Sequence, residues 1–307
     1  MRICSLLPSA TEVLFALGLG DSVAGVTHEC DFPPEAATKP ALISSRVDPN
    51  AKSDDLDCSV RELMAGGESL YAVRDDLLRE IEPDLIITQD LCHVCAASPD
   101  DLASALAKMP KQPRILTLQP HTLTDVWNDI RRIGEATGKS READEFAKRQ
   151  EQKVAAIRAT VSGATGRPRV ACIEWLDPIY VGGHWVPEMV EAAGGVDALG
   201  RAGEPSFTVT SDQVIAAKPD VIVIMPCGFS VKHTTEELRR TPLPPEWDQL
   251  AAVRDGRVFI VDANSYFSRS GPRLAEGVAI LANLLHPNVG AGVHYPPDVA
   301  LGFRSRR

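Results

Sequence analysis

Two stretches of the chain share one pattern of apolar positions. The segments "EPDLIITQD" (82–90) and "KPDVIVIMP" (218–226) each place a Pro-Asp pair before an unbroken apolar run. Continuous apolar runs of this length are typical of strands buried on both faces of a parallel sheet. In each half an acidic residue, Asp76 or Asp212, lies seven positions before the proline. The polar segment around this residue predicts a short helix. The pattern therefore predicts a duplicated structure.

The match between the two halves extends outward from these strands. Opening strands are predicted at 2–7 and 169–175, and later strands at 113–118 and 256–262. Gly18 and Gly194 follow corresponding apolar segments, and glycine commonly ends a helix because it adopts positive φ without strain. Amphipathic segments at 122–138 and 272–287 predict closing helices. Because strands and helices alternate, each half is expected to be an α/β layer with a mainly parallel sheet.

The segment between the halves, 140–162, has no proline or glycine and predicts one long helix with Ser140 as its N-cap. At 1.5 Å per residue such a helix spans about 35 Å. The expected domains are an N-terminal lobe at 1–138, a connecting backbone helix at 139–165 and a C-terminal lobe at 166–307.

Several of these segments together resemble a known family. The similar segments are "SLLPSATEVLFALGLGDSVAGVT", "EPDLIIT", "SDQVIAAKPDVIVI", "AAVRDGRVFIVD" and "RSGPRLAEGVAILANLLHP", which extend from about residue 2 to 287. They resemble the helical-backbone (class III) substrate-binding proteins of ABC importers, which bind cobalamin and ferric siderophores. "THECDFPPEA" (27–36) is most similar to the cobalamin-binding branch.

This resemblance implies two Rossmann-like lobes joined by the long helix, with a ligand cleft between the lobes. It also implies cobalamin or a related corrinoid as ligand, and ABC permease subunits as partners. Asp76 and Asp212 correspond to acids that dock onto those subunits. The alternative reading is that both are acids at helix N-termini, where the helix dipole favours negative charge.

Charge and composition exclude two classes of function. The formal net charge of the 307-residue chain is -10, and its basic residues alternate with acids, so a nucleic-acid partner is not expected. No stretch contains the roughly 18 apolar residues that a membrane span requires. Pro8, Thr11 and Glu12 interrupt the N-terminal apolar segment, and the seven cysteines are an odd number. These features predict a cytoplasmic, reducing location; removal of an export signal would make the chain extracytoplasmic instead.

Ligands of open parallel sheets bind beyond the carboxyl ends of the strands. The loops expected there hold candidate polar ligand contacts: Ser9, His28, Glu29, Gln89, Glu174 and Arg269. Ser9-x-x-Glu12 matches a capping box, whose helix N-terminus can also receive a polar ligand group. Glu174 and Arg269 are expected to pair or to meet polar ligand edges.

Aromatic residues concentrate in the same predicted loops of the second half: Trp175, Tyr180, Trp185, Tyr266 and Phe267. Aromatic walls suit a broad, mostly apolar corrin or haem-like macrocycle. The alternative is ordinary packing at the edge of a lobe.

The cysteines raise a separate possibility. His28, Glu29 and Cys30 follow the second predicted strand, and "QDLCHVC" places Cys92, His93 and Cys95 after a later strand. Cys30, Cys92 and Cys95 with a histidine would fit zinc, and three thiols with an open position would fit an iron–sulfur cluster. The alternatives are buried thiols, a redox pair, or a thiol or imidazole that contacts the cobalt of a bound ligand.

Three functions follow from these observations. The leading hypothesis is a non-catalytic binding protein for cobalamin or a related corrinoid, serving an ABC importer. The second is a cytosolic metalloprotein or enzyme on the same scaffold, with metal held by the cysteines. The third is a siderophore or haem binder. The sequence has no HExxH, phosphate-loop or Ser-His-Asp pattern.

Overall fold

The structure of the protein is a computed structural model. The structure describes residues 1–47, 53–66, 69–91, 99–107, 109–289, 295–296 and 298–303. The chain forms two compact units: Met1–Ala51, Asp55–Pro120 and Thr124–Lys148 in the first, and Lys52–Asp54, His121–Leu123 and Arg149–Arg307 in the second. Each unit is described by itself.

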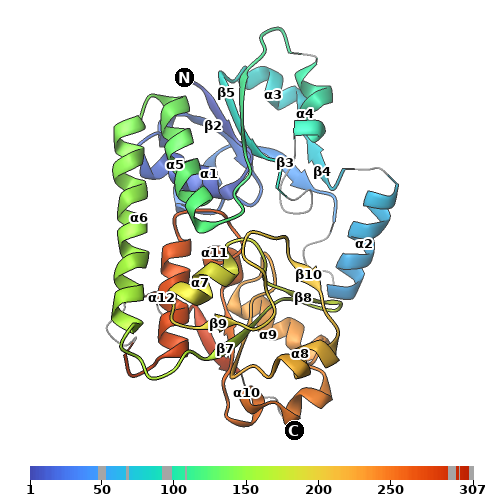
Figure 1. The fold of residues 1–307 in the computed structure, drawn as a ribbon. Coiled ribbons are helices and arrows are strands. Elements are labelled where there is room, and N and C mark those ends of the chain that lie inside the picture. Colours follow the sequence, from blue (N-terminus) through green and yellow to red (C-terminus); the bar gives the residue numbers. More distant parts are fainter. Residues whose placement is uncertain are drawn as a thin grey trace. The chain divides into compact units, whose positions relative to one another are not determined.

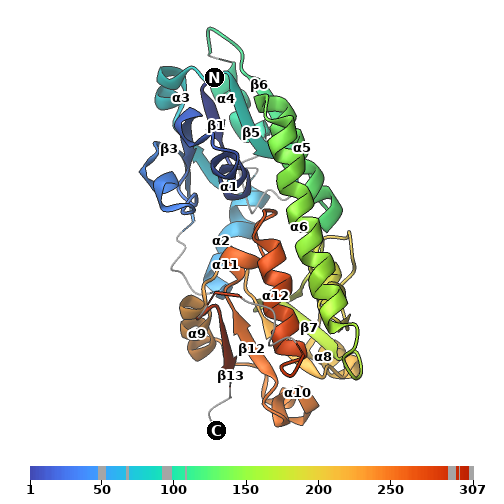
Figure 2. The same ribbon diagram turned by 90° about the vertical axis from the view of Figure 1, so that its left-hand side faces the viewer.

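The first unit is built on a sheet with the strand order β4-β3-β2-β1-β5-β6. β3 and β4 pair antiparallel, and the other neighbours pair parallel. Figure 2 shows β1, β5 and β6 side by side. The elements of this part of the chain are β1 (Ile3–Ser5), α1 (Pro8–Ala16), η1 (Gly20–Ser22), β2 (Val23–Thr27), η2 (Pro34–Thr38), β3 (Ala41–Ser45), α2 (Ser53–Ala65), β4 (Tyr71–Val73), α3 (Asp75–Ile81), β5 (Leu85–Gln89), α4 (Pro99–Leu106), β6 (Arg114–Leu118) and α5 (Leu123–Thr137).

The continuous apolar run in β5 is explained by burial on both faces. Ile86 belongs to a core cluster with Leu78 of α3 and Leu102 of α4. Leu85 and Ile87 are equally buried, and successive side chains of a strand point to opposite faces. The run is therefore apolar at every position, as the sequence pattern predicts.

The second unit has a sheet with the order β10-β8-β7-β11-β12-β13, and β9 pairs with β7 outside this path. β7, β11 and β12 are parallel, whereas β8, β10 and β13 join antiparallel. Figure 2 shows β13 beside β12, and in Figure 1 α7 lies beside α12. The elements are β7 (Arg169–Leu176), β8 (Ile179–Val181), α7 (Val186–Ala192), β9 (Val196–Asp197), β10 (Phe207–Thr208), α8 (Ser211–Ala217), β11 (Val221–Ile224), α9 (Val231–Arg240), η3 (Pro245–Gln249), α10 (Ala251–Arg254), β12 (Val258–Val261), α11 (Ala263–Tyr266), α12 (Leu274–Leu285) and β13 (Ala300–Phe303).

The predicted long helix is α6 (Ser140–Val161), which has 22 residues and therefore spans about 33 Å. The helix begins at Ser140, so this residue lies in the first turn and not at the predicted N-cap position. The boundary between the two units falls within α6, after Lys148.

Local geometry repeats in the two halves. α1 and α7 are each followed by a glycine with positive φ, Gly18 at 73° and Gly194 at 84°, which confirms the predicted helix ends. Glu82 and Lys218 hold the left-handed C-cap positions of α3 and α8, each directly before the Pro-Asp pair. The mixed α/β architecture with two parallel-rich sheets is thus confirmed. No helix in the described ranges carries an apolar segment long enough to cross a membrane.

Candidate functional site

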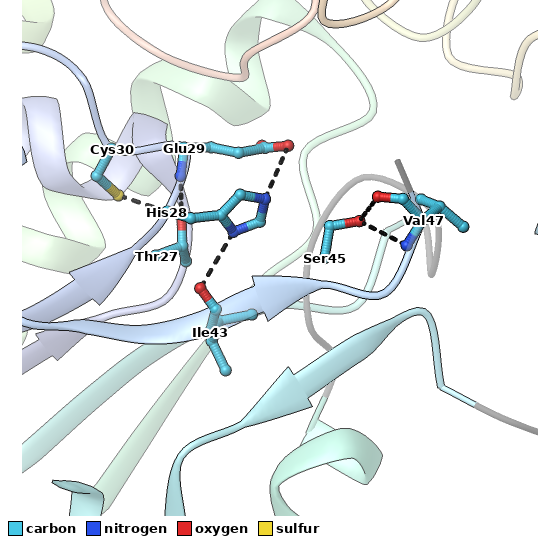
Figure 3. Close-up of polar contacts among 7 residues, drawn as sticks. All are labelled: Thr27, His28, Glu29, Cys30, Ile43, Ser45 and Val47. Atoms are coloured by element: carbon cyan, nitrogen blue, oxygen red, sulfur yellow. Dashed lines mark hydrogen bonds and ion pairs between the residues drawn. The ribbon is translucent and has the colours of Figure 1, made fainter. Parts of the chain in front are cut away.

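Polar side chains cluster at the carboxyl end of β2 (Figure 3). The backbone N–H of His28 donates to the carbonyl oxygen of Ile43 on β3 at 3.1 Å, and the Nδ1 atom of His28 lies 3.1 Å from the same oxygen. The Nε2 atom lies 3.9 Å from Oε1 of Glu29. The backbone N–H of Glu29 donates to Thr27 Oγ1 at 3.2 Å. This turn therefore fixes the imidazole against β3 and leaves one nitrogen pointing away from it.

Cys30 lies in the same turn but faces the interior. Its side chain is buried, with Sγ 3.1 Å from Thr11 Oγ1 and 3.5 Å from Thr27 Oγ1. Thr11 in turn donates a hydrogen bond to Ser5 Oγ at 2.8 Å. Hydroxyl groups from α1 and β2 thus contact the thiol, and Thr11 links it to the hydroxyl of Ser5 on β1.

The predicted cysteine cluster is not supported. Cys92, His93 and Cys95 lie outside the residues that the structure describes. Within the described ranges, no group of three or more His, Cys, Asp or Glu side chains could hold a metal ion. Zinc or an iron–sulfur cluster therefore has no support here.

Of the other described cysteines, two are buried in strands and two are exposed. Cys4 and Cys172 are buried in β1 and β7, as predicted, and burial raises the pKa of the Cys4 thiol to about 12. Burial also raises the pKa of the Cys172 thiol. Cys58 and Cys227 are exposed.

The capping box predicted at Ser9 and Glu12 is wrong. α1 begins at Pro8, its N-cap is Leu7, and no side chain caps it. Proline is favoured at the first helical position because it has no N–H to satisfy and its φ is already helical. Ser9 and Glu12 are therefore inside the helix and buried. A complete capping box does occur at Thr210 and Gln213 in α8. Gln89 ends β5 and is buried.

In the second unit, Glu174 near the end of β7 accepts a hydrogen bond from Ser206 Oγ at 2.5 Å. The backbone carbonyl of Glu174 accepts from the N–H of Cys227, beyond β11, at 3.1 Å. Arg269 is half-buried after α11, and its carbonyl accepts from the N–H of Gly271 at 2.8 Å. Glu174 and Cys227 thus meet at the ends of adjacent parallel strands.

Trp175 ends the strand that the sequence predicts at 169–175, whereas the loop expected at Tyr180 was wrong: Tyr180 lies on β8 as the antiparallel register partner of Trp175 on β7. β7 ends at Leu176 and β8 begins at Ile179, so the turn between them is short and Tyr180 belongs to the sheet. Trp175 packs edge-on against Phe229, with ring centroids 5.4 Å apart, and Phe229 stacks on His233 at 3.7 Å. The Nε1 atom of Trp175 is buried and has no hydrogen-bond partner among the described residues.

Trp185, Tyr266 and Phe267 are buried side chains. Nε1 of Trp185 donates to the carbonyl oxygen of Phe267 at 2.8 Å, which joins the start of α7 to the end of α11. Arg273 lies over the Tyr266 ring, 5.6 Å from its centroid, and burial raises the pKa of the tyrosine. These aromatic residues pack within the second unit.

The sequence reading missed the pair of histidines at 121 and 184. Their ring centroids are 5.7 Å apart. His184 has a φ of 49°, and its Nδ1 atom is buried without a hydrogen-bond partner in the described part of the chain. Burial, and secondarily His121, lowers the pKa of His184. The residues are far apart in sequence, so no local signal predicts their contact.

Asp76 and Asp212 both lie in the first turns of short helices, α3 and α8, and are exposed. Hydrogen bonding from the N–H of Leu77, together with Arg74 at 3.5 Å, lowers the pKa of Asp76. These positions are equivalent in the two units, as the repeat predicts.

Residues 3–265 match the family model described as periplasmic binding protein. An uncharacterized ABC transporter substrate-binding lipoprotein, YvrC, of Bacillus subtilis (strain 168) is 27% identical over 297 residues, which are 94% of this chain and 80% of that protein.

Two further proteins are similar over most of their length. The vitamin B12-binding protein of Vibrio parahaemolyticus serotype O3:K6 (strain RIMD 2210633) is 22% identical, over 90% of this chain and 86% of that protein. The crystal structure of a periplasmic heme binding protein from Pseudomonas aeruginosa superimposes with a TM-score of 0.72 at 19% identity, covering 100% of this chain and 98% of that one. The predicted cytoplasmic location is not supported, because the matching family and the lipoprotein relative are extracytoplasmic in type.

Proposed function

The chain belongs to the periplasmic binding protein family of ABC importers, and from this premise we propose that it binds a corrinoid as an extracytoplasmic, non-catalytic substrate-binding component. The observation that carries the proposal is the chemistry at the strand ends, where an oriented imidazole and carboxylates lie in the first unit and an aromatic group with a carboxylate lies in the second.

In the first unit, the ligand contacts that we propose come from the end of β2 and the end of β5. His28 and Glu29 are partly exposed, with side-chain exposures of 31% and 48%. Gln89 is the last residue of β5 and Asp90 follows it; the carboxylate of Asp90 accepts a hydrogen bond from Gln119 Nε2 at 2.9 Å. Ser9, buried in α1, would support the first turn of that helix.

In the second unit, Trp175 and Tyr180 are register partners on β7 and β8, and Glu174 precedes Trp175 on β7. Aromatic faces suit the apolar face of a macrocycle, and carboxylates suit amide N–H donors at its edge. Arg269 completes the proposed contacts. Trp185, Tyr266 and Phe267 are buried within the second unit, so we assign them to packing and not to ligand contact.

The edge chemistry favours a corrinoid over haem. A corrinoid is rimmed mainly by amides, whereas haem carries carboxylates. Glu29 and Asp90 at the strand ends of the first unit would repel carboxylates but can accept hydrogen bonds from amides. Several relatives named as vitamin B12-binding proteins agree with this choice, and the haem binder of similar fold supplies the competing hypothesis.

Calorimetry and equilibrium dialysis test the proposal directly. The purified protein is titrated with cyanocobalamin, cobinamide and haemin, and we expect micromolar or tighter binding of at least one corrinoid, with quenching of tryptophan fluorescence. If the protein binds haemin and none of the corrinoids tested, the ligand is haem and the corrinoid proposal is wrong. Metal that co-purifies stoichiometrically with a protein that binds neither would favour a metalloprotein on the same scaffold.

We also propose that Asp76 and Asp212 dock onto permease subunits. They occupy equivalent, exposed positions in the two units. The double variant Asp76→Asn/Asp212→Asn is expected to keep ligand affinity while losing ligand-stimulated transport in vesicles that contain the cognate importer. Unchanged transport by this variant would remove the docking role.

A further inference from the structure

The hydrogen-bonding pattern of His28 determines which of its nitrogens carries a proton. A backbone carbonyl oxygen can only accept a hydrogen bond, so the contact of Nδ1 with the Ile43 oxygen at 3.1 Å places the proton on Nδ1. A neutral imidazole carries one N–H. The lone pair of neutral His28 is therefore on Nε2.

The orientation of the ring is fixed as well as its tautomer. The Ile43 oxygen receives both the backbone N–H and the side chain of His28, so the residue is held at two points by one atom of β3. Figure 3 shows Nε2 on the side of the ring that points away from β3 and toward the Glu29 carboxylate. A lone pair presented in this way, with the opposite N–H bound to a carbonyl, is the arrangement that makes histidine an effective metal ligand.

The surroundings of Nε2 admit a ligand. The His28 side chain is 31% exposed, and Nε2 lies 3.9 Å from Glu29 Oε1, beyond the distance of a hydrogen bond. The nitrogen thus lies at ion-pair distance from the Glu29 carboxylate but too far from it for a hydrogen bond. That charge favours a cationic metal centre over a neutral one.

We propose that Nε2 of His28 is an axial ligand to the cobalt of the bound corrinoid, an inference that rests on the proposed function. The ligand class is a corrinoid whose cobalt(III) carries an exchangeable water, such as aquacyanocobinamide. The Nε2 lone pair forms the Co–N bond as the Co–O bond to water breaks, and the water leaves intact. No electron is transferred, and the proton stays on Nδ1, which continues to donate a hydrogen bond to the Ile43 carbonyl oxygen.

The experiment compares wild-type protein with His28→Ala, using aquacyanocobinamide and dicyanocobinamide. Replacement of water by nitrogen changes the visible absorption of cobalt, so wild-type protein is expected to shift the aquacyanocobinamide spectrum and His28→Ala is not. We expect the variant to bind aquacyanocobinamide about 10–100-fold more weakly. Dicyanocobinamide has both axial positions occupied by strong ligands, so both proteins are expected to bind it alike and without a spectral shift.

A matched control removes a different half-buried histidine. His233→Ala loses the stack on Phe229 but leaves His28 in place, and it is expected to retain the spectral shift. Corrinoid binding with identical spectra for wild type and His28→Ala would overturn the coordination and leave the proposed function intact. If dialysis shows that no corrinoid is retained, the proposed function fails, and the coordination fails with it. Circular dichroism of each variant verifies that it is folded.

Discussion

The ammonium group of Lys111 lies 2.7 Å from Oδ1 of Asp84, the aspartate of the first Pro-Asp pair. The other carboxylate oxygen of Asp84, Oδ2, accepts a hydrogen bond from the backbone N–H of Arg2 at 2.9 Å. Asp220 of the second unit accepts the backbone N–H of Arg169 at 2.8 Å, so the two halves fasten their opening strands in the same way. The Lys111 contact, followed by the Arg2 N–H, lowers the pKa of Asp84 to about 2.

This pKa makes a prediction for acid stability. A carboxyl group whose pKa is lowered in the folded protein stabilises the fold at any pH above the pKa that the group has in the unfolded chain. This contribution to the free energy of unfolding is lost as the pH falls from about 4 to about 2. Asp84→Asn is expected to unfold at a lower urea concentration than wild type at pH 6, with the difference shrinking below pH 4. Glu145→Gln, which removes an exposed ion pair with Arg141 at 3.7 Å, is the control and should change little. A difference that stays constant with pH would contradict the assignment.

Asp129 is expected to behave in the opposite sense. Burial raises its pKa to about 6 even though Arg132 donates to it at 2.7 Å. The protonated Asp129 carboxyl therefore contributes fully to the stability of the fold below about pH 4, and this contribution is lost as the pH rises through about 6. As the pH rises from 4 to 8, the free energy of unfolding of wild type should therefore fall by on the order of 2–3 kcal/mol relative to that of Asp129→Asn, whose residue 129 has no charge to titrate. Urea unfolding of both proteins across this range measures the relative slope; parallel curves would rule the prediction out.

The packing of α12 on its neighbours requires a glycine at position 277. A Cβ there would collide with the backbone carbonyl oxygen of Tyr266 and with Cε of Met189. Gly277→Ala is expected to lower the free energy of unfolding by about 1–3 kcal/mol, despite the better helix propensity of alanine. Gly302→Ala on β13 meets open space and serves as the control. Equal thermal stability of the two variants would show that α12 can move aside.

Trp175 and Trp185 should respond differently to replacement by phenylalanine. Trp185→Phe loses the hydrogen bond to the Phe267 carbonyl and leaves a small cavity, so we expect a loss of about 1–3 kcal/mol. Trp175→Phe also removes a buried N–H with no partner in the described part of the protein, which offsets the lost volume, and we expect a change below about 1 kcal/mol.

Fluorescence separates the roles of the two residues in binding. If Trp175 contacts the ligand, Trp175→Phe should lose part of the corrinoid-induced quenching and bind more weakly. Trp185→Phe, once shown to be folded, should retain its affinity. The reverse result would assign the contact to Trp185.

The sequence was sufficient for features that depend on nearest neighbours along the chain. Apolar runs gave the parallel strands β5 and β11, and Gly18 and Gly194 marked the ends of α1 and α7. The absence of proline and glycine at 140–162 predicted α6. Each follows from the backbone preferences or periodicity of a single segment, so it can be read without knowing what packs against it.

The tertiary structure alone decided which polar and aromatic groups meet. Trp185 is buried and donates a hydrogen bond to the carbonyl of Phe267, a residue 82 positions away, and Tyr180, expected in a loop, pairs with Trp175 in the sheet. Likewise, the tautomer and direction of His28 are fixed by a carbonyl on β3 and not by the residues beside it. A side chain takes its burial, partner and protonation from atoms that the fold brings near, and sequence periodicity carries no information about those distant neighbours.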